Sequence, residues 1–282
     1  MAERNQSCDG LLLHAKEGLS GSRIVNILTA EQGLIDVFVF GGAKSTLRSL
    51  ASPFVFAKVF IYSDNIKNYK KLNDLAIIES FPGLRETYER LLSAEVVAEF
   101  ILKTSACGGE YHAVMSDALT AFHLLQNADD SMADMVLCCF LWRMLAILGL
   151  EPDLTSCIAC DREPERSGHS SPLFWYSEDR IGFVCSDCAD SYNRNSTNTG
   201  QFEHPHYTDR PERLVPVDVD LQHLLELFSY QGFEGIRNLS AVDQCGLLNL
   251  PSINEELAKK TKRIVFSLAQ SAAEGSLLTL KA

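Results

Sequence analysis

The sequence has no apolar run long enough to cross a membrane. Its longest apolar run, residues 137–150, includes Arg143 and is shorter than the roughly 20 residues that span a bilayer. The first residues also lack the basic stretch followed by an apolar run that marks a secretory signal. We therefore expect a cytosolic protein, in which thiols stay reduced and paired cysteine motifs indicate a metal site rather than disulfides.

The sequence also lacks an excess of positive charge. Its formal net charge is −12, which by itself argues against a nucleic-acid partner. The distribution is uneven, because residues 1–72 hold 9 Lys and Arg against 6 Asp and Glu, a net charge of +3, and the remainder carries −15. The chain is thus a mildly basic N-terminal module on an acidic body, although +3 is weak beside the footprint of many nucleic-acid binders.

No catalytic constellation is evident. Residues 41–49 superficially resemble a phosphate-binding loop, but Ala43 stands where the glycine before the lysine belongs, and Phe38 stands where the first glycine belongs. No Ser/His/Asp order, carboxylate pair or open metal site favours an enzyme, so we expect no enzymatic activity. The segment around Lys44 is either a basic loop that contacts backbone phosphates or a solvated connection.

The N-terminal segment, from residue 8 to about 81, has the pattern of a small β-barrel. Segments rich in β-branched, leucine and aromatic residues are 11–13, 24–29, 34–40, 54–62 and 75–78. Five short strands in so short a segment are typical of a closed barrel of the OB type, with an SH3-like barrel as the alternative. We place Phe38, Phe40 and Phe56 in the core rather than outward, where they could stack on bases.

From Pro82 the apolar period becomes helical. Helices are expected over about residues 84–102, 113–125 and 135–150, then over 220–228 and 252–272. The first three should pack as a bundle, and Ser131 is the expected N-cap of the third.

Two polar segments lie in the C-terminal half. Residues 190–213 contain few apolar side chains and predict a mobile connection. The cationic run 259–263 is interpreted as a solvated helix face rather than an accessory phosphate contact.

Four cysteines form the most specific motif. They are arranged as two Cys-x-x-Cys pairs, Cys157 with Cys160 and Cys185 with Cys188. This spacing lets both sulfurs of a pair reach one ion, and four thiolates suit tetrahedral Zn²⁺. Residues 173–176 and 181–184 predict a hairpin that carries the second pair, as in a zinc ribbon. A closed site of this kind stabilises a fold; the alternatives are four reduced thiols without metal, or a redox dithiol.

Several runs of residues match the pattern of a known family. The runs are 22–25 (SRIV), 28–34 (LTAEQGL), 42–45 (GAKS), 50–54 (LASPF), 140–145 (FLWRML) and 149–160 (GLEPDLTSCIAC). In this order they resemble the RecO family of bacterial recombination mediators. The resemblance covers about residues 10 to 188 well and the tail weakly.

The resemblance implies a multi-domain α+β protein. It implies an N-terminal OB-fold β-barrel over residues 1–81 and an α-helical domain over 82–282, which is interrupted by an inserted four-cysteine zinc ribbon at 155–190 and a flexible connection at 190–213. The implied activity is to bind single- and double-stranded DNA, anneal complementary strands and help load recombinase onto protein-coated single strands. The implied partners are DNA, RecR and the acidic C-terminal tail of the single-strand-binding protein, in the bacterial cytoplasm at the nucleoid.

The resemblance also implies a DNA-binding surface. The basic barrel surface of the family corresponds here to Arg23, Lys44 and Arg48, and we add Lys70 and Lys71 on charge alone.

One residue departs from the family pattern, because Asp161 replaces the glycine that usually follows the second cysteine, and we expect it to loosen that pair. The acidic body favours an alternative function, a zinc-stabilised adaptor that bridges proteins without binding DNA.

Overall fold

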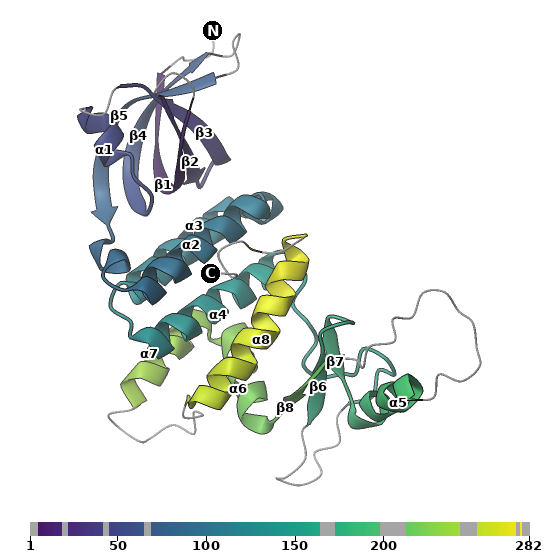
Figure 1. Cartoon of the computed structure of the whole chain (residues 1–282). Helices are drawn as coiled ribbons and strands as arrows, with labels where there is room; N and C mark the ends of the chain where they lie inside the picture. The colour runs from purple at the N-terminus through teal and green to yellow at the C-terminus, as the bar shows by residue number, and fades with distance from the viewer. Residues whose placement is uncertain are drawn as a thin grey trace. The chain divides into compact units, whose positions relative to one another are not determined.

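A computed structural model describes residues 5–18, 22–41, 45–64, 69–163, 173–197, 213–242, 253–274 and 277, without the side chains of 192–197 and 240–242. The chain forms two compact units, Met1–Phe140 with Ser276–Ala282, and Leu141–Gly275 (Figure 1). Within the described part of the chain, no helix combines the length and the apolar character needed to span a bilayer.

The first unit begins with a closed five-stranded barrel. Its strands are β1 (Asn5–Glu17), β2 (Arg23–Thr29), β3 (Gly33–Val39), β4 (Val55–Asp64) and β5 (Tyr69–Ser80). They follow the order β1-β2-β3-β5-β4, and β4 pairs with β1 to close the barrel. The β3–β5 pair is parallel and the other pairs are antiparallel. This arrangement confirms the predicted OB-type barrel.

Alternation along the strands fills the barrel interior. On β3, Ile35, Val37 and Val39 point inward and are buried, since successive strand residues face opposite sides. A short helix, α1 (Thr46–Leu50), lies between β3 and β4, and its Leu47 packs against this core.

The predicted core placement of the three barrel phenylalanines was wrong. Phe38 and Phe56 are only half-buried and Phe40 is 50% exposed. On β3 the β-branched residues already occupy the inward positions, so the alternating Phe38 falls on the outer face.

Helices complete the first unit. They are η2 (Pro82–Arg85), α2 (Tyr88–Lys103), η3 (Ala106–Gly109), α3 (Tyr111–Leu125) and the start of α4 (Asp130–Ile147). Leu84 lies in the 3-10 turn η2 rather than in the first long helix, which begins after the N-cap Thr87. Asp129, not Ser131, accepts a hydrogen bond from the Met132 N–H at 2.8 Å, so α4 starts two residues earlier than a Ser131 cap would place it.

The barrel packs on α3 through aromatic and glycine contacts. The Phe122 ring lies edge-on to Phe54 and Phe81, with ring centroids 5.4 and 5.5 Å away. Gly33 turns the β2–β3 hairpin with a φ of +68°, and a Cβ at this position would lie 2.5 Å from the Tyr111 ring. Only glycine therefore fits both the backbone conformation and the space.

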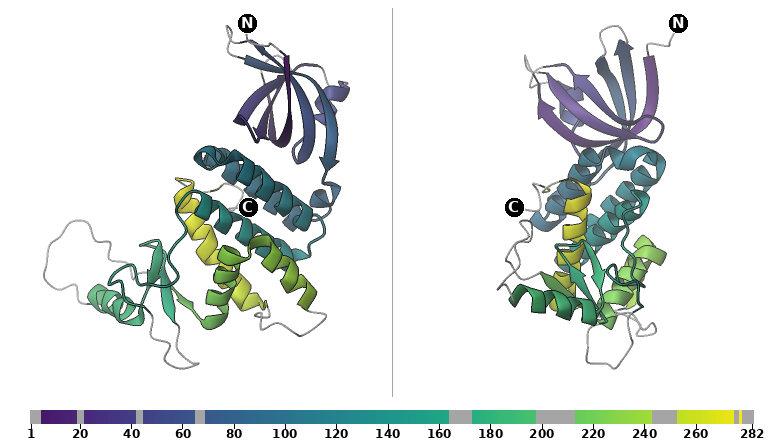
Figure 2. Two further views of the ribbon diagram at one scale, coloured as in Figure 1. Left: turned by 180° about the vertical axis from the view of Figure 1, so that it is seen from behind. Right: turned by 90° about the vertical axis from the view of Figure 1, so that its right-hand side faces the viewer.

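The second unit contains a small antiparallel sheet. Its strands are β6 (Phe174–Ser177), β7 (Gly182–Val184) and β8 (Leu214–Val217), in the order β7-β6-β8. Figure 2 shows the second unit, in teal to yellow, in two further views. The β6–β7 hairpin confirms the prediction, whereas β8 was not expected. The helix α5 (Ser186–Thr197) replaces the first part of the predicted mobile connection, and residues 198–212 of that connection lie outside the described residues.

Among the described residues, the second unit also contains three further helices and the end of α4. They are α6 (Val219–Tyr230), α7 (Gly232–Val242) and α8 (Glu255–Ala272). Buried Trp142 donates its Nε1–H to Glu151 and Ser229, both at 2.9 Å. The Tyr176 hydroxyl donates to Ser267 on α8 at 3.0 Å, which ties the sheet to the helices. Burial raises the pKa of Tyr176 to about 12.

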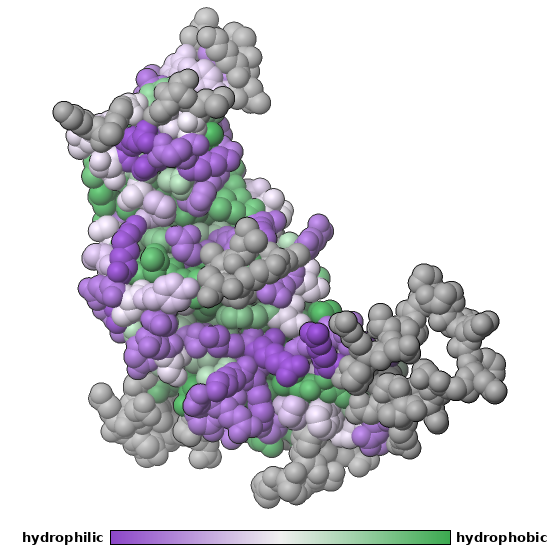
Figure 3. Space-filling model, in the orientation of Figure 1, coloured by the Kyte–Doolittle hydropathy of each residue, from purple (hydrophilic) through white to green (hydrophobic). Residues whose placement is uncertain are grey.

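Cations of the run 259–263 on α8 form ion pairs with carboxylates. Lys259 pairs with Glu255 at 2.5 Å, Lys260 with Asp218 at 3.1 Å, and Arg263 with Glu178 at 2.5 Å. Figure 3 shows hydrophilic side chains gathered on this face of α8. The run therefore fits the solvated face better than a phosphate contact.

Candidate functional site

The two predicted cysteine pairs converge on one point. Cys157 and Cys160 lie in the turn after α4, Cys185 follows β7, and Cys188 lies in the first turn of α5. The Sγ atoms of all four lie within 4.8 Å of one another, so the cluster could hold a metal ion.

Backbone hydrogen bonds fold each pair into a tight turn. In the first pair, the Asp161 N–H donates to the Cys157 carbonyl at 2.8 Å. The Ile158 N–H donates to the Phe183 carbonyl at 2.9 Å, and this bond docks the turn on β7. The Ile158 side chain lies over Gly182, where a Cβ would meet it at 2.8 Å. A glycine on β7 is therefore what lets the first pair approach the second.

The sulfur geometry fits a tetrahedral ion. The Sγ atoms of Cys160 and Cys185 are 3.8 Å apart. Four sulfurs at the usual Zn–S distance of about 2.3 Å would stand about 3.8 Å from one another in a tetrahedron. Four soft thiolates are also the ligand set that Zn²⁺ favours in structural sites. A bound divalent ion would offset part of the negative charge of the four thiolates and would join the two turns.

The thiols differ in acidity. The Arg162 backbone N–H lowers the pKa of Cys160 to about 6. Burial raises the pKa of Cys185 and Cys188. A cation must displace the remaining protons, so its binding weakens as the pH falls.

Asp161 occupies the position where the resemblance noted in the sequence implies glycine. Its φ is +55°, in the left-handed region that glycine adopts freely and that aspartate tolerates better than most residues. The turn is therefore formed with aspartate, at a conformational cost that glycine would not carry.

An acidic side chain lies among the predicted basic residues that the structure describes. Glu17 lies between Arg23 and Arg48, pairs with Arg23 at 3.3 Å and makes a close ion pair with Arg48. Hydrogen bonding from Arg48 and Arg23 lowers the pKa of Glu17, so its carboxylate is charged at neutral pH. The Arg23 guanidinium also donates to the Arg48 carbonyl at 3.1 Å.

The two lysines of β5 contact uncharged partners. Lys71 lies 5.8 Å from the centre of the Phe40 ring. Lys70, the neighbouring strand residue, donates to the Gln32 side chain at 3.4 Å. Lys44 lies outside the described residues.

Sequence reasoning missed two parts of this surface. The first is the Glu17 carboxylate, for which the sequence gives no signal because 31 positions separate it from Arg48. The second is an aromatic cluster of exposed Phe40, just after β3, with half-buried Phe38 of β3 and Tyr69 of β5. The alternation of Phe38 with Val37 and Val39 was the signal that could have revealed it.

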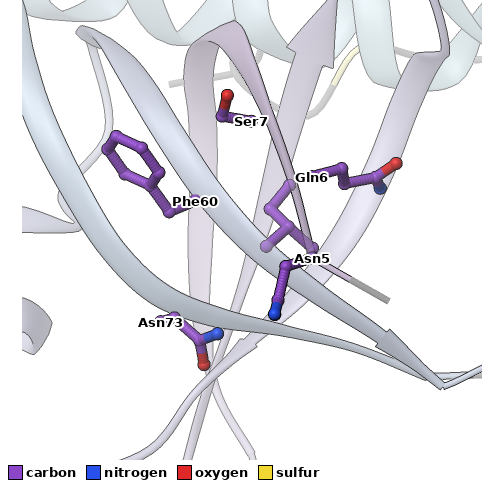
Figure 4. A pocket seen from close by; sticks show the side chains of 6 residues that line it. Asn5, Gln6, Ser7, Phe60 and Asn73 are labelled. Atoms are coloured by element: carbon purple, nitrogen blue, oxygen red, sulfur yellow. The ribbon is translucent and has the colours of Figure 1, made fainter. Parts of the chain in front are cut away.

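The barrel also has a shallow pocket of about 360 Å³. It is lined by Asn5, Gln6, Ser7, Phe60, Ile61 and Asn73 (Figure 4). None of these side chains is ionisable, so the pocket offers amides and one ring but no charge.

Comparisons with known proteins agree on one family. Residues 1–81 match the family model described as Recombination protein O N terminal, and residues 85–244 match Recombination protein O C terminal. The chain is 24% identical over 237 residues to the DNA repair protein RecO of Symbiobacterium thermophilum, covering 83% of this chain and 88% of that protein. It is 23% identical over 239 residues to the DNA repair protein RecO of Bacillus subtilis (84% and 82%). For the protein of that name from Heliobacterium modesticaldum, the identity is 29% over 182 residues (63% of each chain).

Proposed function

The chain belongs to the RecO family, and from this membership we propose that it is a DNA repair and recombination mediator. It binds single- and double-stranded DNA, anneals complementary strands and helps load recombinase onto protein-coated single strands, without enzymatic chemistry. Its protein partners are RecR and the acidic tail of the single-strand-binding protein, and it works in the bacterial cytoplasm at the nucleoid.

The observation that carries the proposal is the OB barrel with cations beside the end of β3. We assign DNA contact to Arg23, Lys44, Arg48, Lys70 and Lys71. Guanidinium groups bind phosphate oxygens in the same forked geometry as carboxylates. The two arginines that hold Glu17 are thus arranged to exchange that carboxylate for a phosphate, and Glu17 acts as a competitor that keeps the affinity modest.

The proposal divides the chain into two domains. We assign DNA contact to the barrel, residues 1–81. The helical domain, residues 82–282, is interrupted by the cysteine insertion at 155–190 and by the connection at 190–213. We assign Zn²⁺ to Cys157, Cys160, Cys185 and Cys188 as a structural ion, since four protein ligands leave no position for a reacting water.

Salt-dependent binding of a single-stranded oligonucleotide tests the proposal. The double variant Arg23→Glu with Arg48→Glu should lose roughly 10-fold or more in affinity at low salt. Each phosphate contact on a single strand contributes about −0.7 to the slope of log K against log salt, so two lost contacts should flatten that slope by about 1.4. Strand annealing should fall in parallel.

Lys259→Glu is the matched control, because it reverses an exposed, ion-paired cation on α8 outside the barrel. It should leave both the affinity and the slope unchanged. Equal binding by the barrel variant and the control would contradict the DNA assignment.

A second candidate, the zinc-stabilised adaptor, is favoured by the Glu17 carboxylate that shares both arginines. Under this alternative those contacts hold the β1–β2 and β3–α1 segments together and have no ligand. Retained binding of the acidic tail peptide, with no strand binding or annealing even in dilute buffer, would select it.

A further inference from the structure

Three aromatic rings gather on the outer face of the barrel where β3 meets β5. The Phe38 and Phe40 rings stack with centroids 6.3 Å apart and planes inclined by 20°. Tyr69 meets Phe38 edge-on at 6.3 Å. Phe40 is 50% exposed, so a large flat ring faces solvent.

Barrel stability does not account for this cluster. The buried core of the barrel is made by inward residues of all five strands, and none of the three rings belongs to it. Exposed aromatic side chains that are grouped rather than scattered mark binding surfaces. Aromatic rings beside cationic side chains are also the combination on which bases stack in single-strand-binding proteins.

Charge around the rings indicates the ligand. Lys71 lies over the Phe40 ring, and Arg48 donates to the carbonyl of Gly41, the residue after Phe40, at 3.4 Å. Both cations therefore stand beside the exposed ring, where they could meet the phosphates of a base that stacks on it.

Acidic residues bound the other side of the cluster. Asp36, two positions before Phe38 on the same outer face, is exposed and accepts a hydrogen bond from Asn26 at 2.6 Å. Asp64 is the register partner of Tyr69. Carboxylates repel phosphates, so a bound strand would run past Phe40 toward Arg48 and away from Asp36.

We propose that Phe38, Phe40 and Tyr69 form a stacking platform for the unpaired bases of single-stranded nucleic acid. This inference rests on the proposed function and adds that the barrel holds bases as well as phosphates. A duplex keeps its bases paired inside the helix and cannot use the platform. The platform therefore gives the barrel a preference for single strands.

Two oligonucleotides of equal length can distinguish the contribution of the bases to binding from that of the phosphates. One is oligo(dT), and the other is an abasic strand with the same number of phosphates. The unmodified protein should bind oligo(dT) at least about 5-fold more tightly, because base stacking on an aromatic ring is worth roughly 1–3 kcal/mol per base. Phe40→Ala should remove most of this difference and leave the abasic strand bound as before.

Phe60→Ala is the matched control. Phe60 is also an exposed phenylalanine of the barrel, 39% exposed on β4, but it lies outside the cluster, so its variant should keep the full difference between the two strands. Phe40→Trp retains a stacking ring and should bind oligo(dT) at least as well as the unmodified protein. Its indole fluorescence should be quenched by oligo(dT) and not by the abasic strand.

The outcomes distinguish the platform from the proposed function. If the protein binds both strands equally and Phe40→Ala changes neither, the platform is overturned and phosphate binding stands. An equal loss on both strands would also overturn it, because Phe40 would then support the phosphate site. Failure of the unmodified protein to bind either strand would remove the proposed function and the platform together.

Discussion

The residues of the cysteine cluster and of the basic barrel surface were both predicted from the sequence. In the structure the cysteines converge, whereas the basic residues contact several different partners. All four cysteines meet at one point. Of the basic residues, Arg23 and Arg48 share Glu17, Lys71 covers a ring, and Lys70 reaches Gln32. The cysteine cluster depends on two short turns, and the cysteine spacing of each turn can be read from the sequence. The barrel surface depends on which strands lie side by side, and on acids that come with them.

Removal of a proposed metal ligand should have the largest effect on stability. Cys157→Ser should eliminate bound zinc and destabilise the second unit by more than about 4 kcal/mol, since loss of a structural ion is among the largest single-site effects. Both tryptophans, Trp142 and Trp175, lie in Leu141–Gly275. Urea unfolding followed by tryptophan fluorescence therefore reports this unit alone.

The barrel supplies the control for that experiment. Cys8→Ser changes a half-buried thiol on β1, away from the cluster, and should keep the zinc content and the tryptophan transition. Zinc retained in full by Cys157→Ser would refute the ligand assignment.

Gly33→Ala tests the barrel side of the comparison. Its Cβ would need a φ of +68° and would strike the Tyr111 ring, so we expect a loss of about 2 kcal/mol in the first unit. Gly108→Ala is the matched control, because its φ is +74° with nothing within 4 Å, and it should lose only about 1 kcal/mol. Hydrogen exchange of the barrel amides measures both, and equal losses would show that Tyr111 is irrelevant.

Asp161 places an unfavourable left-handed backbone conformation next to the cysteine cluster. Asp161→Gly should relieve the left-handed backbone and stabilise the metal-bound form by up to about 1 kcal/mol, whereas Asp161→Val should destabilise it. Competition with a chromophoric chelator gives the zinc affinity of each variant. Identical affinities for glycine and valine would mean that the φ of +55° carries no cost.

The smallest effect is expected at Glu17. Its pKa is lowered in the fold by Arg48 and Arg23, so the stability that it contributes is present above the pKa of an unfolded glutamate and is lost as the pH falls through the lower, folded value. At neutral pH only substitution removes this charge. Glu17→Gln should tighten oligonucleotide binding about 3-fold at low salt and steepen its salt dependence. Weaker binding would show that Glu17 positions the arginines rather than competing with DNA.

Sequence patterns predicted the parts that depend on neighbours along the chain. Alternation located the barrel strands and the β6–β7 hairpin, and the apolar period located α3, α4 and α8. The same patterns failed where two local signals compete. Asp129 and Ser131 are both good N-caps, and only the fold shows that Asp129 is used.

The remaining errors have tertiary causes. Phe38 was placed inside because large rings are usually buried, but its neighbours Val37 and Val39 already fill the interior. The polar segment after Cys188 is helical as far as Thr197 although its composition predicted a connection. Ala189 in its first turn belongs to a buried cluster with Cys157 and Val184, a tertiary contact that composition does not reveal.

The strand order of the small sheet limits how far the cysteine motif can be moved between proteins. The central strand β6 pairs with β7 on one side and with β8 on the other, with Tyr176 opposite Val215. A synthetic peptide with both cysteine pairs but without β8 would keep all four thiols and still leave one row of β6 amides open. Unpaired amides on a strand edge pair with strands of other chains. The excised peptide should therefore self-associate rather than fold as a stable monomer.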